Sequence, residues 1–261
     1  MSARLQLYTF KLSLWAAAAR LAINELNVPD VKQTEVDLSK AENFSPEFLK
    51  INPNHTVPAL EINEHGSKRF LDDTKSVVEY LDKLTGGHLY PAEKQAEIDR
   101  LIQKMHGEAD VGNPLFFTSG HPDELKAKKD QIVSFLEDRI KGWETYATQA
   151  PEHKQLYEKN IQETKGLLAF YTSADPEPMF GKNKQLWEAG SRFLDELEAH
   201  LKQSGGDYLL GEYTVADIHL TPYLHRLLLV RKPEEVFANR PTLKAYYERV
   251  QARPSFKKTF Q

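Results

Sequence analysis

The first 85 residues alternate between short strand patterns and helix patterns. Leu5–Thr9 and Val31–Val36 are typical of short strands. Between them, Ser13–Leu26 contains four consecutive alanines with apolar residues around them, which predicts a helix beginning at Ser13. The later segments predict a helix turn starting at Ser45, a hairpin of residues 58–62 and 68–71, and a helix over 73–84. The order β-α-β-α-β-β-α predicts a small sheet with helices on its faces.

Strand patterns disappear after Pro91. Helix patterns separated by glycine and proline clusters predict helices over residues 92–105, 123–143, 151–171, 184–202, 215–229 and 241–252. The chain therefore predicts two domains, an α/β domain over 1–85 and an all-α domain over 92–261. The segment Thr85–Pro91 is the expected linker.

The composition narrows the possible function classes. The chain has 261 residues, an ordinary globular mixture and a formal net charge of −4 with scattered positive residues, which disfavours nucleic-acid binding. The absence of cysteine excludes disulfides, thiolate metal sites and a cysteine nucleophile. The nine histidines are dispersed, so no metal site is expected. Without an apolar run of roughly 20 residues or a signal-peptide profile, we expect no membrane span and a cytoplasmic location.

Three short segments carry candidate chemistry, and each also has an ordinary structural explanation. A cis peptide at Val57–Pro58 would offer backbone groups to another peptide, whereas a trans proline would only open an edge strand. Asp73 and Thr74 at a helix start could bind a zwitterion, or simply cap the helix. The Ser13 hydroxyl could donate to an anion and shift a thiol toward thiolate, or act only as an N-cap.

The order and spacing of these segments resemble the cytosolic glutathione transferase family. Ser13 and Arg20 in the first helix, the segment Ser45–Leu60 with its Asn-Pro-x-His-Thr-Val-Pro motif, and the pair Asp73–Thr74 resemble serine-type members of the delta and theta kind. The segment Asp207–Asp217 is similar to the family's C-terminal signature, in which Asp217 closes a structural capping box. The resemblance implies a thioredoxin-like first domain, an all-helical second domain, glutathione as co-substrate and a homodimer.

The resemblance also implies roles for individual residues. Ser13 would donate to the glutathione sulfur, and Val57 would pair with the cysteinyl backbone. Asp73 and Thr74 would hold the γ-glutamyl group, whereas His55 and Lys75 would meet the glycyl end. Tyr8 and Thr9 are the rivals for the catalytic hydroxyl, because tyrosine-type transferases place a tyrosine at the end of the first strand.

An apolar second-substrate site lined by both domains is implied as well, and its candidates could equally be core aromatics. The candidates are Phe10, Trp15, Phe116 and Phe117, with Leu12 and Tyr171 beside them. The implied reaction is conjugation of glutathione to a hydrophobic electrophile, as in detoxification. Glutathione-dependent ether cleavage, peroxide reduction and non-catalytic ligand binding are the alternatives.

Two features depart from the delta and theta pattern. Asn43 stands where the delta kind often has a second histidine. The helical part is longer between Gly120 and Lys184, which resembles fungal or microbial members with a reshaped substrate cleft.

Overall fold

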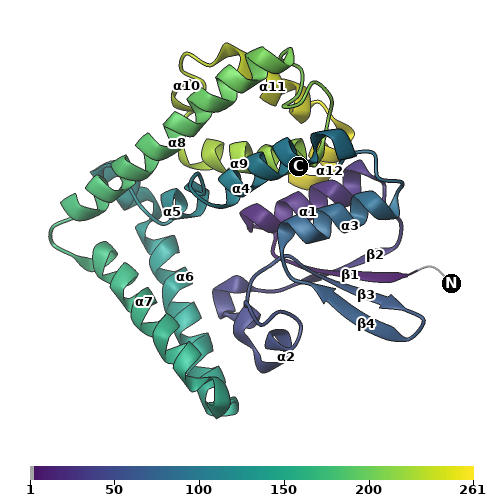
Figure 1. Ribbon diagram of the computed structural model, residues 1–261. Coiled ribbons are helices and arrows are strands. Elements are labelled where there is room, and N and C mark those ends of the chain that lie inside the picture. The colour runs from purple at the N-terminus through teal and green to yellow at the C-terminus, as the bar shows by residue number, and fades with distance from the viewer. Residues whose placement is uncertain (1–2) are drawn as a thin grey trace.

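The fold begins with a four-stranded mixed sheet. The computed structural model describes residues 3–261, and all of its strands lie before residue 72. The strands are β1 (Arg4–Thr9), β2 (Val31–Glu35), β3 (Ala59–Glu64) and β4 (Ser67–Leu71). Their order is β2-β1-β3-β4, with β1 parallel to β2 and antiparallel to β3. The predicted order of strands and helices is confirmed, and the sheet with its helices forms a thioredoxin-like domain (Figure 1).

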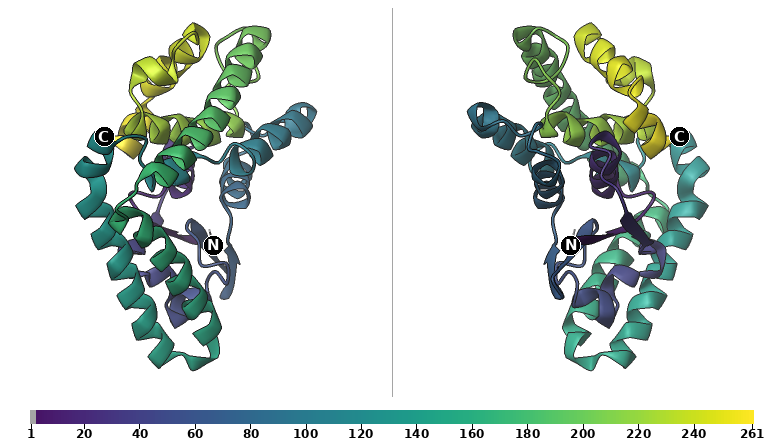
Figure 2. Two further views of the ribbon diagram at one scale, coloured as in Figure 1. Left: turned by 90° about the vertical axis from the view of Figure 1, so that its left-hand side faces the viewer. Right: turned by 90° about the vertical axis from the view of Figure 1, so that its right-hand side faces the viewer.

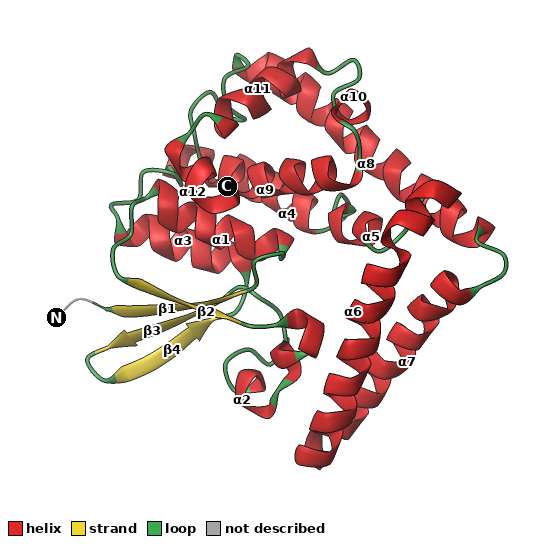
Figure 3. Cartoon of the chain, turned by 180° about the vertical axis from the view of Figure 1, so that it is seen from behind, coloured by secondary structure: helices red, strands yellow, loops and turns green. Residues whose placement is uncertain are grey.

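Three helices accompany the sheet: α1 (Leu14–Glu25), α2 (Pro46–Leu49) and α3 (Thr74–Leu84). Figure 3 shows α1 and α3 side by side on one face of the sheet. The alanines of α1 are buried, and their small side chains let the helix pack closely. Helix α1 ends before Asn27, whose φ of 50° leaves the right-handed helical region.

The rest of the chain is helical, and the six predicted helices are all confirmed. The helix predicted over 123–143 continues to Gln149, and the one predicted over 184–202 starts seven residues earlier, at Glu177. Three helices of four to seven residues are additional. The complete set is α4 (Gln95–His106), α5 (Gly112–Phe116), α6 (Pro122–Gln149), α7 (Lys154–Thr172), α8 (Glu177–Ser204), α9 (Val215–Val230), α10 (Pro233–Val236), α11 (Pro241–Gln251) and α12 (Pro254–Phe260).

Helix α9 lies at the centre of the molecule. Most of its residues are buried, and it packs against α1, α4 and α5, so one apolar core joins the sheet domain to the helical domain. The predicted capping box is present at its start. Thr214 N donates to Asp217 Oδ2 at 2.8 Å, and the fully buried Asp217 also accepts from Leu209 N at 3.1 Å. Asp217 therefore fixes the helix start, as the sequence predicted.

Helices α6 and α7 form a long antiparallel hairpin, whose apolar residues share a cluster with Ala41, Phe44 and Leu49 of the sheet domain. The hairpin leaves the helical domain and runs beside the short helical turns η1 (Leu38–Lys40) and η2 (Glu42–Phe44), near α2 (Figures 1 and 2). A Cβ at Gly142 would overlap the carbonyl oxygen of Lys40, so the backbones approach closely there. Tyr157 Oη donates to Phe44 O at 3.1 Å. The insertion noted in the sequence therefore packs on the sheet domain.

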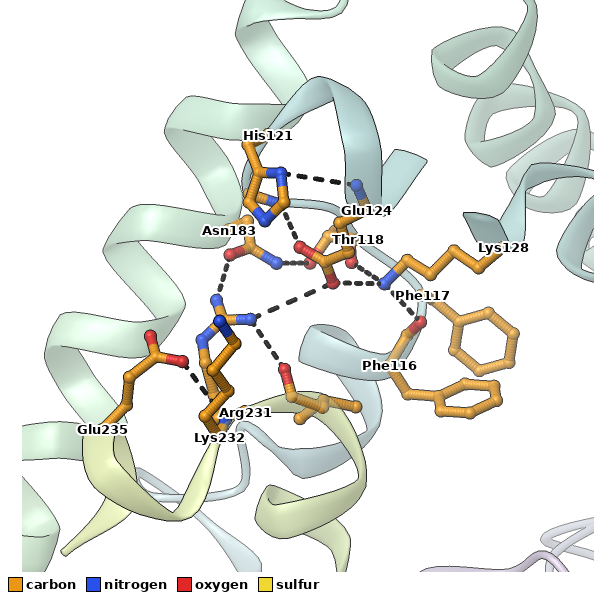
Figure 4. Close-up of polar contacts among 12 residues, drawn as sticks. Phe116, Phe117, Thr118, His121, Glu124, Lys128, Asn183, Arg231, Lys232 and Glu235 are labelled. Atoms are coloured by element: carbon orange, nitrogen blue, oxygen red, sulfur yellow. Dashed lines mark hydrogen bonds and ion pairs between the residues drawn. The ribbon is translucent and has the colours of Figure 1, made fainter. Parts of the chain in front are cut away.

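A partly buried polar network anchors the base of this hairpin (Figure 4). The Glu124 carboxylate accepts from Gly120 N at 2.7 Å and from Lys128 Nζ at 2.9 Å. The Arg231 guanidinium lies 3.9 Å from Glu124 and donates to Asn183, which in turn donates to Thr118 Oγ1 at 2.9 Å. The start of α6 is thereby tied to α8 and to the end of α9. None of the helices formed by residues 3–261 is long and apolar enough to cross a membrane.

Candidate functional site

Ser13 occupies the N-cap of α1, directly after the first strand. Its backbone N–H donates to Phe10 O at 2.9 Å, and its Oγ accepts from Ala16 N at 3.2 Å. Arg20 fixes the loop from the other side, donating to Thr9 Oγ1 at 2.6 Å and Phe10 O at 2.9 Å. The half-buried Ser13 hydroxyl has accepted one bond and can still donate its own proton.

The loop before β3 presents an unpaired backbone. The Val57–Pro58 peptide is cis. Within residues 3–261, neither the N–H nor the C=O of Val57 takes part in a hydrogen bond. The Val57 side chain packs in one cluster with Ala16, which lies one turn along α1 from Ser13. A bound peptide could therefore pair with Val57 close to the start of α1.

The start of α3 lies against the same loop. The fully buried Asn52 donates through Nδ2 to Thr56 O at 2.9 Å and to Asp72 O at 3.2 Å. Asp73 is the exposed N-cap of α3 and accepts from Ser76 N at 2.9 Å, whereas Thr74 is buried. Asn52 thus holds the Val57 loop next to the start of α3, where the Asp73 carboxylate and free backbone N–H groups lie.

The sheet register brings these segments together. Tyr8, near the end of β1, pairs with Ala59, the first residue of β3. The turn into α1 and the cis peptide therefore lie at the same end of the strands, and Asn52 joins the start of α3 to the loop of the cis peptide. Ser13, Val57, Asp73 and Thr74, predicted separately from the sequence, share one end of the domain.

The two residues expected at the glycyl end have different surroundings. The His55 ring stacks on Phe44 with ring centroids 4.2 Å apart. Burial lowers the pKa of His55, and the charge of Arg139 lowers this pKa further, so His55 is neutral at neutral pH. The Lys75 ammonium already contacts Glu79 at 3.1 Å and Asp99 at 3.0 Å. Although burial opposes it, hydrogen bonding to Asp99 and Glu79 raises the pKa of Lys75, which therefore stays a paired cation.

The hydroxyls of the rival residues are engaged elsewhere. Tyr8 Oη donates to Glu61 Oε2 at 3.3 Å, and burial together with the Glu61 charge raises the pKa of Tyr8. Thr9 is buried, and its Oγ1 accepts the bond from Arg20. A raised pKa opposes deprotonation of Tyr8, and Thr9 is held inside the loop.

Of the aromatic residues expected around a second substrate, Phe116 lies beside Ser13. Both line a cavity of about 390 Å³ between α1, α9 and α12. Leu12 and Leu229 line it as well and are 59% and 62% exposed, so apolar surface faces solvent next to Ser13. Phe116 and Leu229 also border a larger cavity of about 1020 Å³, whose polar wall is the network around Glu124. The two cavities are therefore neighbours.

The other aromatic candidates have separate positions. Phe10 packs with the Val57 cluster, and Phe117 lines an apolar cavity of about 440 Å³ away from Ser13. Trp15 stacks on His106 at 3.6 Å and donates to Asp110 Oδ2 at 3.0 Å, so it packs between the two domains. The buried Tyr171 donates its hydroxyl to Phe117 O at 2.9 Å.

One cluster near the site was not expected from the sequence. His106 and His219 are 113 residues apart in the chain, yet their ring nitrogens lie 2.8 Å from each other. His106 also lines a cavity of about 440 Å³ with Asp73 and Thr74. Burial lowers the pKa of His106 to about 4. No local spacing signals this pair, because the two histidines lie on different helices. Among residues 3–261, no three His, Cys, Asp or Glu side chains come together as a metal site.

Two family models match the chain. The model described as "Glutathione S-transferase, N-terminal domain" matches residues 7–88, and "Glutathione S-transferase, C-terminal domain" matches residues 163–260. Together they account for more than two thirds of the sequence. The segment between them includes α6 and the start of α7.

Curated relatives match over nearly the whole chain. "Glutathione S-transferase TCHQD" of Arabidopsis thaliana is 26% identical, covering 97% of this chain and 88% of the relative. "Tetrachloro-P-hydroquinone reductive dehalogenase" of Sphingobium chlorophenolicum is 29% identical, covering 96% of this chain and 93% of the relative.

Solved structures share the fold. Beta-etherase LigF from Sphingobium superposes with a TM-score of 0.68 at 23% identity, covering 98% of both chains. A glutathione transferase from Burkholderia graminis, solved with two glutathione molecules bound per subunit, gives a TM-score of 0.67 at 20% identity, covering 98% of this chain and 87% of that one.

Proposed function

Because this chain belongs to the glutathione S-transferase family, an enzyme family, we propose that it binds glutathione where Ser13, Val57 and Asp73 meet. The bound thiolate then attacks a hydrophobic electrophile. The observation that carries the proposal is the unpaired Val57 backbone, held between an N-cap hydroxyl and an acidic helix start. We further propose a serine-type member, a cytoplasmic location and a homodimer.

The peptide part of glutathione fits the polar groups at this edge. The cysteinyl N–H and C=O pair with the free C=O and N–H of Val57 in an antiparallel arrangement. At the start of α3, backbone N–H groups and Thr74 receive the α-carboxylate of the γ-glutamyl group, and the exposed Asp73 carboxylate receives the ammonium. These contacts fix the sulfur close to the start of α1.

Ser13 then stabilises the thiolate. Its hydroxyl donates a hydrogen bond to the sulfur while Oγ keeps its bond from Ala16 N. The positive end of the α1 dipole adds to the effect. A hydrogen bond to a charged group contributes roughly 1.5–3 kcal/mol, enough to lower a thiol pKa by about 1–2 units.

The second substrate occupies the apolar surface beside Ser13. Leu12, Phe116 and Leu229 line that cavity, and we propose that residues 92–261 complete this site while residues 1–85 bind glutathione. In the reaction a sulfur–carbon bond forms, the bond from that carbon to its leaving group breaks, and the leaving group takes the electron pair. The likeness to a dehalogenase over nearly the whole chain favours aryl halides, with chloride as the leaving group.

Two measurements test the proposal together. We expect the protein to be retained on immobilised glutathione, and to conjugate chlorodinitrobenzene with release of one chloride per thioether. The Ser13→Gly variant should be retained but turn over more slowly. Retention without turnover of this or other aryl halides would instead support a ligand-binding protein, and lack of retention and of glutathione binding would refute the proposal.

A further inference from the structure

The α6–α7 hairpin carries a partly buried cation without an acidic partner. The Arg139 guanidinium donates to Leu38 O and lies 4.8 Å from the Trp143 ring and 5.7 Å from the Phe44 ring. Among residues 3–261, no carboxylate lies within 4 Å of Arg139. Burying a charge without an opposite charge is unfavourable, and contacts with aromatic faces offset only part of that cost. The environment of Arg139 therefore suits an anion supplied by a ligand.

Arg139 lies next to the glycyl end of the proposed glutathione site. The Phe44 ring lies 5.7 Å from the Arg139 guanidinium carbon and stacks on the His55 ring with centroids 4.2 Å apart. The guanidinium carbon is therefore at most about 10 Å from the His55 ring. With the γ-glutamyl group at the start of α3 and the cysteine at Val57, the glycyl carboxylate extends to the opposite side of Val57. In the proposed binding mode His55 lies on that side, and Asn43 and Phe44 contact it.

The residues expected to meet this carboxylate provide no free positive charge. His55 is neutral because burial lowers its pKa. Lys75 is paired with Glu79 and Asp99. Asn43 is neutral, and its amide donates to the carbonyl oxygen of His55 at 2.6 Å. Of the cations whose charge acts on His55, Lys159 is exposed and lies 3.9 Å from Glu163, so within the described residues Arg139 is the one without an acidic partner.

We propose that Arg139, contributed by the α6–α7 hairpin, supplies the cation that binds the glycyl carboxylate of glutathione beside His55. This inference rests on the proposed function and adds a specificity-determining residue to it. A guanidinium presents paired N–H donors that match the two oxygens of a carboxylate, so the choice of arginine suits this task.

The hairpin holds Arg139 in place before a ligand arrives. Its base is anchored by the network around Glu124 (Figure 4), and its middle by the close approach of Gly142 to Lys40. Farther along, Tyr157 donates to Phe44 O. A cation fixed in this way loses little conformational freedom on binding, which favours affinity.

The test compares glutathione with its glycyl monoethyl ester, in which an uncharged ethyl ester replaces the glycyl carboxylate. We expect the unmodified protein to bind glutathione about 10- to 100-fold more tightly than the ester, as for a charge-assisted hydrogen bond. In Arg139→Gln this ratio should fall to about threefold or less. Lys141→Gln removes the same charge from an exposed position on the same helix, where the side chain is 70% exposed and paired with Asp138, and should keep the full ratio.

Several results would overturn the inference. Equal affinity of the unmodified protein for glutathione and the ester would do so without any variant. An Arg139→Gln protein that keeps the full ratio would do so as well. If Arg139→Gln does not fold, Arg139→Lys takes its place, and its shorter reach should give a ratio below that of the unmodified protein, whereas an unchanged ratio refutes the role. Failure to bind glutathione at all would refute the proposed function itself, which keeps the two failures distinguishable.

Discussion

Replacing Ser13 separates its observed role as N-cap of α1 from the catalytic role that we propose for it. Ser13 Oγ accepts from Ala16 N, which caps α1, and we propose that its proton also stabilises the glutathione thiolate. Glycine is nearly as good an N-cap as serine, whereas alanine is not. Ser13→Gly therefore removes the hydroxyl while largely keeping the cap, and Ser13→Ala removes both functions.

The magnitudes follow from these two contacts. Loss of the N-cap bond in Ser13→Ala should lower the free energy of unfolding by about 1 kcal/mol, and Ser13→Gly should lower it by only a few tenths. Loss of a hydrogen bond to the charged sulfur costs roughly 1.5–3 kcal/mol. Since 1.36 kcal/mol corresponds to one pKa unit, the bound thiol in both variants should titrate about 1–2 units higher than in the unmodified protein.

The assay is the ultraviolet absorbance of bound glutathione thiolate, followed against pH at saturating glutathione. Urea unfolding of the same proteins measures the capping contribution. Tyr8→Phe is the matched control, because it also removes one hydroxyl near the end of β1, and its thiol titration should remain that of the unmodified protein. If Ser13→Gly titrates like the unmodified protein while Tyr8→Phe shifts, the assignment of Ser13 is wrong.

Three further predictions concern Asp73, Gly142 and His106. Asp73→Asn keeps a good N-cap but loses the negative charge that we propose binds the ammonium of glutathione, so the affinity measured by calorimetry should fall about 10- to 100-fold while the free energy of unfolding stays unchanged. An unchanged affinity would contradict this proposed role. Gly142→Ala should lower the free energy of unfolding by about 1–3 kcal/mol because its Cβ overlaps the backbone of Lys40, whereas Gly166→Ala on the open surface of α7 should raise it slightly. Equal urea midpoints for the two variants would refute the close packing at Gly142. Burial lowers the pKa of His106 to about 4 from the 6.5 of an unperturbed histidine, so between these pH values the unfolded chain binds more protons and stability falls as the pH falls. The free energy of unfolding lost in this way approaches about 3 kcal/mol, and His106→Phe should reduce the difference between urea unfolding at pH 7 and at pH 4.5. If the difference in the variant equals that in the unmodified protein, His106 is not its source.

The fold was predictable where the sequence pattern is local and strong. The alanine-rich segment after Ser13 and the hairpin around residues 63–67 carry their signals within a few residues, and the structure has both. Helices α5, α10 and α12 have four to seven residues, too few for a helical period to repeat. The equally short α2 was predicted, because its Ser45-Pro46 start is a local signal that needs no helical period.

In the candidate site, too, local motifs were predictable and contacts between distant segments were not. Ser13, Val57 and Asp73 could be predicted as candidates because each belongs to a short motif at the start of an element. The ion pair that occupies the Lys75 ammonium was not predictable, since its partner Asp99 lies on α4, 24 positions farther along the chain. The contact of His106 with His219 joins two different helices and leaves no trace in the spacing of either.

The hairpin shows why an insertion can belong to a site that is far from it in sequence. A helix of 28 residues spans about 42 Å, so α6 can run from its anchor near Glu124 to the turns beside α2. Its buried residues Ile132, Leu136, Ile140 and Trp143 recur every three or four positions and form one stripe. Arg139 neighbours this stripe, so docking of its apolar residues also fixes the guanidinium. Because this packing rather than a carboxylate holds Arg139, its charge stays available for an anion bound beside His55.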